Sequence, residues 1–232
     1  MCGQCGVLLG PTTDRNNAWE MFTKLLLLNE KRGNQSTGIA SVGADGVSRT
    51  LRGVMPSTNF VLDKAYPEYM NHGSTIWMGH CRFATSQPIN WENAHPIISG
   101  DSVGTHNGYV ENDNELFKEF NLPRKAVVDS ELLIALEDAG KLVEGLKKVQ
   151  GPVAMAVWNC REKTFQLIQV DNPLHVAYHD GAMFYSSEAG PLSSIGLTPI
   201  RMPEKTGWKL GPGGLLIESF PVETSQYSRR TS

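Results

Sequence analysis

The chain has 232 residues, of which 40% are hydrophobic and 19% charged, and its formal net charge is −3. This composition is typical of one large globular domain or two small ones, and it lacks the basic surplus that attracts nucleic acid or anionic membranes. Four irregularly spaced cysteines do not indicate a disulfide framework. The first residues lack a signal-peptide pattern, and the longest strongly apolar run, 25–28, is too short to cross a bilayer. We therefore expect a cytoplasmic protein with free thiols.

Hydrophobic patterning predicts the elements of the first half of the chain. A strand at 6–9 precedes a helix at 16–31, whose apolar residues recur at helical spacing and which Gly33 ends. Asp45-Gly46 predicts the turn of a hairpin. The remaining expected elements are hairpin strands at 39–42 and 48–51, a helix at 58–69, strands at 76–79 and 102–105, and a helix at 130–149 that Asp129 caps.

The second half of the chain predicts short strands joined by polar turns. The expected elements are strands at 153–158, 165–170, 175–178 and 183–185, a short helix at 189–195, and a terminal pair of strands at 208–210 and 214–217. Strands and helices are grouped and do not strictly alternate, which favours an α+β fold of packed antiparallel sheets with outer helices. We expect one domain over 1–224 and a polar, flexible tail over 225–232.

Cys2 directly follows Met1, and a small residue at the second position usually means that the methionine is removed. Cys2 would then carry both a thiol and a free α-amino group. The unperturbed pKa of a terminal amine is about 7.7–8.0, so a useful fraction of it is neutral near pH 7 and can accept the proton of the thiol. The sequence thus places a nucleophile and a base on one residue.

Cys2 also forms a C-x-x-C pattern with Cys5, which indicates two alternatives. A redox dithiol requires a strand before the pair, and only Met1 precedes it. A zinc site requires further ligands, and the other two cysteines are single and far apart, although His80 or His106 could complete the site. The first five residues leave open whether the pair is catalytic, redox-active or metal-binding.

Four further stretches could carry chemistry, although each also has an ordinary structural interpretation. The polar segment 32–40 could order a turn near a site or be a plain loop. Arg82, at the end of a strand, could clamp a carboxylate or form a surface ion pair. Asn107 and Gly108 could aim an amide and a backbone N–H at one point, as an oxyanion hole does, or form a turn. Asp129 could hold an amino group or only cap a helix.

Together these stretches resemble the class II, or N-terminal nucleophile, glutamine amidotransferase domains. In their motifs they are most similar to the glutaminase domains of glucosamine-6-phosphate synthase and amidophosphoribosyltransferase. The matching positions are Cys2-Gly3, Arg32-Gly33-x-x-Ser36-x-Gly38-Ile39-Ala40, Gly79-His80-x-Arg82-x-Ala84-Thr85, Asn93-Ala94-His95-Pro96, His106-Asn107-Gly108 with Glu111-Asn112, Asp129-Ser130-Glu131, and Ser187-Glu188. The resemblance implies a four-layer αββα sandwich of two antiparallel sheets flanked by helices, the Ntn-hydrolase fold.

The resemblance also implies an activity, the hydrolysis of the side-chain amide of L-glutamine to glutamate and ammonia. It implies that Cys2 is the nucleophile and forms a γ-glutamyl thioester, that Asn107 and Gly108 are the oxyanion hole, and that neither a metal nor another cofactor is needed. The implied substrate-binding residues are Arg82 and Asp129, for the α-carboxylate and the α-amino group, and Thr85 and Arg32 in support.

Three departures and one absence qualify this resemblance. Phe83 stands where the synthase type has Trp, and Ser86 where it has His, in a loop that closes over glutamine in the family. Cys5 is an unusual neighbour that could form a disulfide with Cys2. Since the chain ends where the glutaminase domain should end, we expect a separate synthase to receive the ammonia. The alternatives are a free-standing hydrolase of another γ-glutamyl amide and a non-catalytic or zinc-binding protein that uses Cys2 and Cys5.

Overall fold

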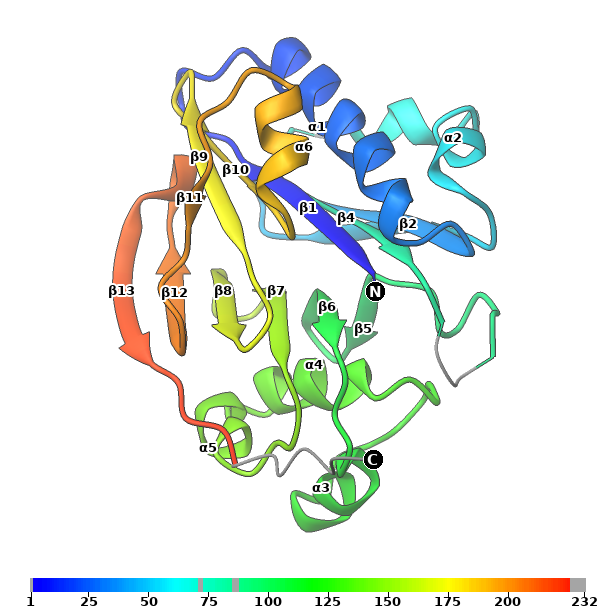
Figure 1. Ribbon diagram of the computed structural model, residues 1–232, viewed down its shortest axis with the longest axis vertical. Coiled ribbons are helices and arrows are strands. Elements are labelled where there is room, and N and C mark those ends of the chain that lie inside the picture. The colour runs from blue at the N-terminus through cyan, green and yellow to red at the C-terminus, as the bar shows by residue number, and fades with distance from the viewer. Residues whose placement is uncertain (1, 71–72, 85–87, 226–232) are drawn as a thin grey trace.

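The computed structural model describes residues 2–70, 73–84 and 88–225, and over these ranges the chain forms two antiparallel β-sheets (Figure 1). The first sheet has the strand order β11 (Ile200–Arg201), β9 (His175–His179), β10 (Ala182–Ser186), β1 (Gly3–Leu8), β4 (Ser74–Arg82), β2 (Ser36–Gly43), β3 (Ser48–Gly53). The second has the order β13 (Leu216–Pro221), β12 (Thr206–Leu210), β8 (Thr164–Val170), β7 (Val153–Asn159), β6 (Ser102–Gly108), β5 (Ile97–Ser99). The strand that follows Cys2 is therefore interior to its sheet.

Helices cover the outer face of each sheet, as Figure 1 shows. The first sheet is covered by α1 (Arg15–Asn29), α2 (Ser57–Phe60) and α6 (Ala189–Ser194), and the second by α3 (Asp113–Glu119), α4 (Ser130–Asp138) and α5 (Leu142–Leu146). Short 3₁₀ turns occupy Glu30–Arg32, Tyr66–Met70 and Pro212–Gly214. The predicted α+β sandwich of two antiparallel sheets between helices is thus confirmed.

The alternation of side chains along β1 explains how the layers pack. Val7 points toward α1 and packs in a cluster with Phe22 and Leu25, whereas its neighbour Leu8 points toward the second sheet. Successive residues of a strand face opposite sides of the sheet. Because β1 is apolar on both sides, both of its faces must be covered, one by α1 and the other by the second sheet. A third cluster, which includes Leu133 of α4, fills the space between the second sheet and its helices. Burial of these apolar faces holds the four layers together.

Two predicted helices are shorter than expected. The helix predicted at 58–69 is wrong beyond its first turn, because α2 ends at Phe60 and only a 3₁₀ turn follows at Tyr66–Met70. The helix predicted at 130–149 is interrupted by Gly140, whose φ is +67°. Lys141 N donates to Leu136 O at 2.8 Å, which closes the end of α4 in a glycine-dependent turn before α5 begins.

The other predicted strands and helices are present with shifted ends. Three elements, β5, β11 and α3, were not expected, and the last strand begins at Leu216 because a 3₁₀ turn occupies Pro212–Gly214. Residues 226–232 of the predicted tail lie outside the described residues. Among the residues that are described, no helix is both long and apolar enough to span a bilayer.

Candidate functional site

Cys2 lies immediately before β1, and its polar atoms are held by three other segments of the chain. Its Sγ lies 3.3 Å from the N of Phe83, which donates to it, and 3.5 Å from the carbonyl oxygen of the same residue. Its carbonyl oxygen accepts hydrogen bonds from Arg32 Nε at 2.6 Å and from Asn107 Nδ2 at 2.8 Å. The backbone and thiol of Cys2 are therefore fixed by residues that are distant in the sequence.

The thiol of Cys2 has a pKa above its ordinary value. Burial raises the pKa most, while the backbone N–H of Phe83 and the positive charges of Arg82 and Arg32 lower it by less. The neutral thiol therefore predominates near pH 7, and a nucleophilic role requires a base that removes its proton.

Arg32 joins Cys2 to a residue near the other end of the chain. Besides its bond to the Cys2 carbonyl, its guanidinium pairs with the carboxylate of Glu188, and its side chain is only 10% exposed. Farther along the same loop, Gln35 Oε1 accepts a hydrogen bond from Ala84 N at 2.6 Å. The loop after α1 thus supports both Cys2 and the segment that carries Phe83.

The amide of Asn107 has one orientation that its neighbours determine. Its Oδ1 lies 3.1 Å from His80 Nε2, and that nitrogen also lies 3.2 Å from the carbonyl oxygen of His106. Burial lowers the pKa of His80 to about 3, so the ring is neutral at pH 7. Because both partners of Nε2 are acceptors, Nε2 carries the proton and donates it. The amide oxygen of Asn107 thus faces His80, and its NH₂ group faces Cys2.

Gly108 follows Asn107 in a conformation that other residues rarely adopt. Its φ is +141°, and a Cβ atom built on it would lie 1.9 Å from the carbonyl oxygen of Pro152. The NH₂ group of Asn107 also donates to Ser187 Oγ at 2.6 Å. Both hydrogens of this amide are therefore engaged within the protein, and an oxyanion would have to replace one of their acceptors.

Arg82 and Asp129 lie close enough for their charges to interact. Arg82 ends β4, is 3% exposed, and donates from Nη1 to Pro88 O at 3.1 Å. Burial lowers the pKa of its guanidinium, and the Cys2 thiol, when ionised, and the carboxylate of Asp129 oppose that effect. Arg82 nevertheless remains protonated at any physiological pH. Thr85, the fourth predicted substrate-binding residue, lies outside the described residues, as does Ser86.

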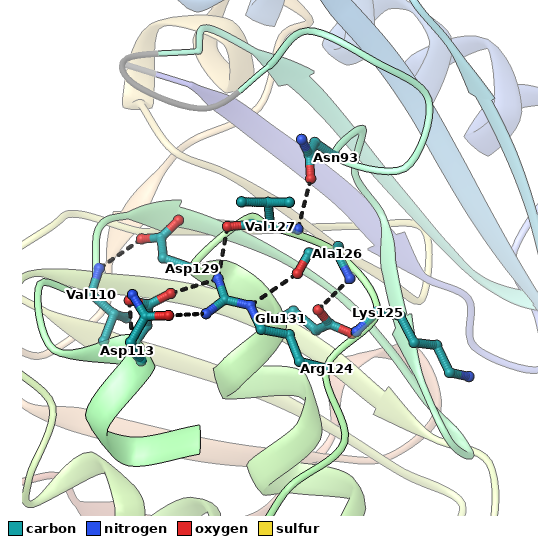
Figure 2. A network of polar contacts seen from close by, with 10 residues as sticks. Asn93, Val110, Asp113, Arg124, Lys125, Ala126, Val127, Asp129 and Glu131 are labelled. Carbon is teal, nitrogen blue, oxygen red and sulfur yellow. Dashed lines mark hydrogen bonds and ion pairs between the residues drawn. The ribbon is translucent and has the colours of Figure 1, made fainter. Parts of the chain in front are cut away.

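Asp129 does not cap α4 as the sequence predicts. Its backbone is already helical, its side chain makes no capping bond, and its Oδ2 accepts from Val110 N at 2.7 Å instead (Figure 2). The carboxylate therefore faces the segment after Gly108, on the side of the oxyanion-hole candidates. The tertiary contact replaces the local one because Val110, two residues after the end of β6, offers its backbone N–H to the carboxylate.

A network of polar contacts holds the segment that leads to Asp129 (Figure 2). The buried carboxylate of Glu131 accepts from Lys125 N at 2.8 Å and Ala126 N at 2.6 Å. The other contacts join Arg124 Nη2 to Asp113 Oδ2 and to Val127 O at 2.8 Å each, Arg124 Nε to Ala126 O at 3.0 Å, and Val127 N to Asn93 Oδ1 at 3.2 Å. The segment before Asp129 is thus held by side chains of α3, of α4 and of the loop that carries Asn93.

Cys5 lies on the opposite face of β1 from the candidate site. It is fully buried in the cluster beneath α1, and its thiol packs beside Gly79. The described cysteines are all free, and the described residues contain no group of three or more His, Cys, Asp or Glu that could hold a metal ion. Burial of Cys5 raises the pKa of its thiol well above the ordinary value, as expected for an unreactive core residue. The structure therefore offers no support for the zinc-binding alternative.

The structure brings together Cys2, Arg32, Arg82, Asn107 and Asp129, which the sequence places on five separate segments. Three residues that contact them, namely His80, Ser187 and Glu188, were not predicted as part of a glutaminase site, although all three stand within matched motifs. His80 was considered only as a possible zinc ligand. Sequence reasoning also missed Asn172, which lies in no motif and whose only sequence signal is an Asn-Pro turn.

Known proteins share this sequence pattern. The family model described as "Glutamine amidotransferase domain" matches residues 80–194. The glutamine–fructose-6-phosphate aminotransferase (isomerizing) of Gluconobacter oxydans is 30% identical over 213 residues, which cover 86% of this chain and 33% of that protein. The enzyme of the same name from Staphylococcus epidermidis is 29% identical over 204 residues, 82% of this chain and 32% of that protein. The chain thus spans about one third of the length of these curated relatives.

Solved structures share the fold. The allosteric regulatory enzyme of purine biosynthesis superposes with a TM-score of 0.78 at 18% identity, over 95% of this chain and 49% of that chain. Glutamine phosphoribosylpyrophosphate amidotransferase from B. subtilis gives a TM-score of 0.76, also at 18% identity and over the same shares. The two-sheet sandwich with a cysteine at the start of its first strand is therefore an N-terminal nucleophile (Ntn) fold. The chain belongs to the class II glutamine amidotransferase domains.

Proposed function

We propose that this chain hydrolyses the side-chain amide of L-glutamine to glutamate and ammonia, with Cys2 as the nucleophile. The observation that supports this most directly is the pair of hydrogen bonds from Arg32 and Asn107 to the carbonyl of Cys2. These bonds fix a terminal cysteine beside an amide NH₂ group. A flexible terminal arm or a cysteine with a purely structural role would not need such anchoring.

The substrate-binding roles follow from charge and position. Arg82 would bind the α-carboxylate of glutamine, and Asp129 would bind its α-amino group, because their opposite charges lie near Cys2 and near each other. Arg32 would support Cys2 through its hydrogen bond to the Cys2 carbonyl oxygen. We retain Thr85 as a supporting residue because of the family motif alone. A substrate held by both charged ends would extend its side-chain amide toward the thiol.

The reaction would proceed by acyl transfer. When Met1 is absent, the α-amine of Cys2 takes the proton of the thiol, and Sγ attacks the amide carbon to form an S–C bond. The C=O π electrons become an oxyanion, which Asn107 and Gly108 would stabilise, each donor contributing roughly 10²–10³ in rate. The C–N bond then breaks as the α-ammonium group of Cys2 gives its proton to the leaving amide nitrogen, and ammonia is released. Water then hydrolyses the γ-glutamyl thioester to glutamate and the free thiol.

The test of this function is the release of glutamate and ammonia from glutamine. We expect wild-type protein to be active and Cys2→Ala to be inactive, while Cys160→Ser, which changes a partly exposed cysteine elsewhere, retains activity. Glutaminase activity in Cys2→Ala would contradict the nucleophile. Mass spectrometry of active protein should show that Met1 has been removed, and an active protein that retains Met1 would contradict the α-amine as base.

We further propose that a synthase on a separate chain receives the ammonia. The matched curated relatives are named as aminotransferases that act on glutamine and fructose 6-phosphate. Co-purification of an acceptor-binding synthase, with glutaminase activity that rises when the synthase is added, would support this. If the protein instead hydrolyses other γ-glutamyl amides faster than glutamine and no synthase affects it, a free-standing hydrolase is the better description.

A further inference from the structure

The main-chain carbonyl of Asn107 is held by a residue of a different loop. Asn172 lies between β8 and β9, is partly buried, and donates from Nδ2 to Asn107 O at 2.8 Å. The two residues are 65 positions apart in the sequence. Asn172 does not contact Cys2, Arg82 or Asp129 through any described hydrogen bond, so its contact with this site is through Asn107.

This hydrogen bond contributes to the direction of the Gly108 N–H. The peptide between Asn107 and Gly108 is planar, and in a trans peptide the carbonyl and the following N–H point in opposite directions. Gly108 is the last residue of β6 and has a φ of +141°. Asn107 and Gly108 pair with Ala154 and Val153 at this end of the β6–β7 ladder, and Gly108 has no side chain to restrain its backbone. A further anchor on the Asn107 carbonyl therefore fixes the peptide more firmly than the ladder alone.

The loop that carries Asn172 is itself braced. Asp171 N donates to Glu204 Oε1 at 2.5 Å, and Leu174 N donates to Gln169 Oε1 at 2.6 Å. Gln169 Nε2 in turn donates to Glu204 Oε2 at 3.1 Å. Backbone groups on both sides of Asn172 are thus fixed by two side chains that hydrogen-bond each other. The amide that holds Asn107 is therefore presented by a fixed loop.

We infer that Asn172 is a positioning residue of the oxyanion hole, which orients the Asn107–Gly108 peptide so that the Gly108 N–H is aimed before substrate binds. This inference rests on the proposed function, because it assumes that Gly108 donates to the oxyanion. Donors that are fixed in advance do not have to reorganise as charge develops, and small misplacements of such groups can cost about 10²-fold in rate. Asn172 would act on the transition state and leave ground-state binding of glutamine unchanged.

The experiment compares wild type with Asn172→Leu, which keeps the size of the side chain and removes its donor. We expect kcat for glutamine hydrolysis to fall about 10–100-fold while KM changes less than about 3-fold. Asn172→Ala repeats the test if the leucine variant does not fold. Asn16→Ala, at the exposed start of α1, is the matched asparagine control and should retain wild-type kinetics.

A second readout separates orientation of the oxyanion hole from general damage. The aldehyde analogue of glutamine adds the Cys2 thiol across its C=O bond to give a hemithioacetal, in which the former carbonyl oxygen occupies the oxyanion position. We expect its Ki to rise in Asn172→Leu by about the factor lost in kcat/KM. In a Cys2→Ala background, the Kd for glutamine should be the same with and without Asn172→Leu.

The possible outcomes are distinct. If wild-type protein does not hydrolyse glutamine, the proposed function fails, and this inference fails with it. If wild-type protein is active and both Asn172 variants match it in kcat and aldehyde Ki, only the inference is overturned. It is also overturned if the Asn172 variants weaken glutamine binding and lower the melting temperature in step with kcat, since that would indicate a structural role.

Discussion

Arg32 Nε donates to the carbonyl oxygen of Cys2 at 2.6 Å, while the same guanidinium pairs with Glu188. One side chain therefore ties the candidate nucleophile to the segment that follows β10. A lysine could keep the charge but could not make both contacts with the same planar geometry.

We expect Arg32→Lys to lower kcat/KM for glutamine by about tenfold or more, since hydrogen bonds to charged groups contribute about 1.5–3 kcal/mol. The physical reason is that Cys2 loses one of the two donors that fix its carbonyl. Steady-state glutaminase assays would measure the change. Lys31→Ala removes a positive charge from the exposed neighbouring residue and should have little effect. Equal losses in both variants would indicate a general charge effect and contradict the specific contact.

Because three histidines are buried, we expect the protein to lose stability in mild acid. Burial lowers the pKa of His80 to about 3, lowers that of His95 well below its usual value, and lowers that of His106 although Asp129 opposes it. In the unfolded chain each histidine takes up a proton below about pH 6.5. Acid therefore stabilises the unfolded state, and stability that is present above pH 6.5 declines as the pH falls toward 3.

For His80 alone, the expected loss of unfolding free energy between pH 7.5 and pH 5 is about 2 kcal/mol. Urea denaturation across this range would measure it. His80→Gln retains a donor for Asn107 Oδ1 but does not titrate, so its stability should depend less steeply on pH. His179→Gln replaces an exposed histidine and should leave the pH dependence unchanged. A wild-type slope in His80→Gln would show that His80 does not contribute.

The glycine at 108 should tolerate no side chain. In Gly108→Ala the new Cβ would lie 1.9 Å from Pro152 O, at a φ of +141° that disfavours any L-residue. We expect a loss of more than about 3 kcal/mol of unfolding free energy, and loss of glutaminase activity in any protein that folds. Gly190→Ala is the control, because a Cβ in α6 there meets nothing within 4 Å; it should be neutral or stabilising by up to about 1 kcal/mol. Thermal melts of the two variants would decide the point.

We expect substitution of Glu131 to weaken substrate binding, although Glu131 is not one of the predicted substrate-binding residues. Its carboxylate accepts the N–H groups of Lys125 and Ala126 just before Asp129 (Figure 2). Glu131→Gln replaces one acceptor oxygen by a donor, which should cost about 1–3 kcal/mol of stability and loosen this segment. We expect the KM for glutamine to rise more than kcat falls. Glu115→Gln, on the exposed side of α3, should change neither, and an unchanged KM in Glu131→Gln would separate Glu131 from substrate binding.

Most strand positions, the hairpin at Asp45-Gly46, and the ordered motifs around Cys2, Arg82, Asn107 and Asp129 could be predicted from the sequence alone. These features are readable because they depend on local patterning, turn chemistry and spacing along the chain. Local patterning was insufficient where tertiary contacts compete. The helix predicted at 130–149 is broken at Gly140, and Asp129, which looks like its cap, bonds to Val110 instead.

The atoms that surround the candidate nucleophile could not be predicted from the sequence, because they come together only in the folded chain. Asn107 meets Cys2 across 105 residues because β1 and β6 lie in different sheets that pack face to face. It meets Asn172 across 65 residues because Asn172 lies in the loop after β8, a strand of the same sheet as β6. Such contacts arise from the arrangement of strands and layers, which leaves no periodic signal in the sequence. The sequence therefore indicated the chemistry of Cys2, whereas the packing of the two sheets supplied the anchors that hold it and the peptide beside it.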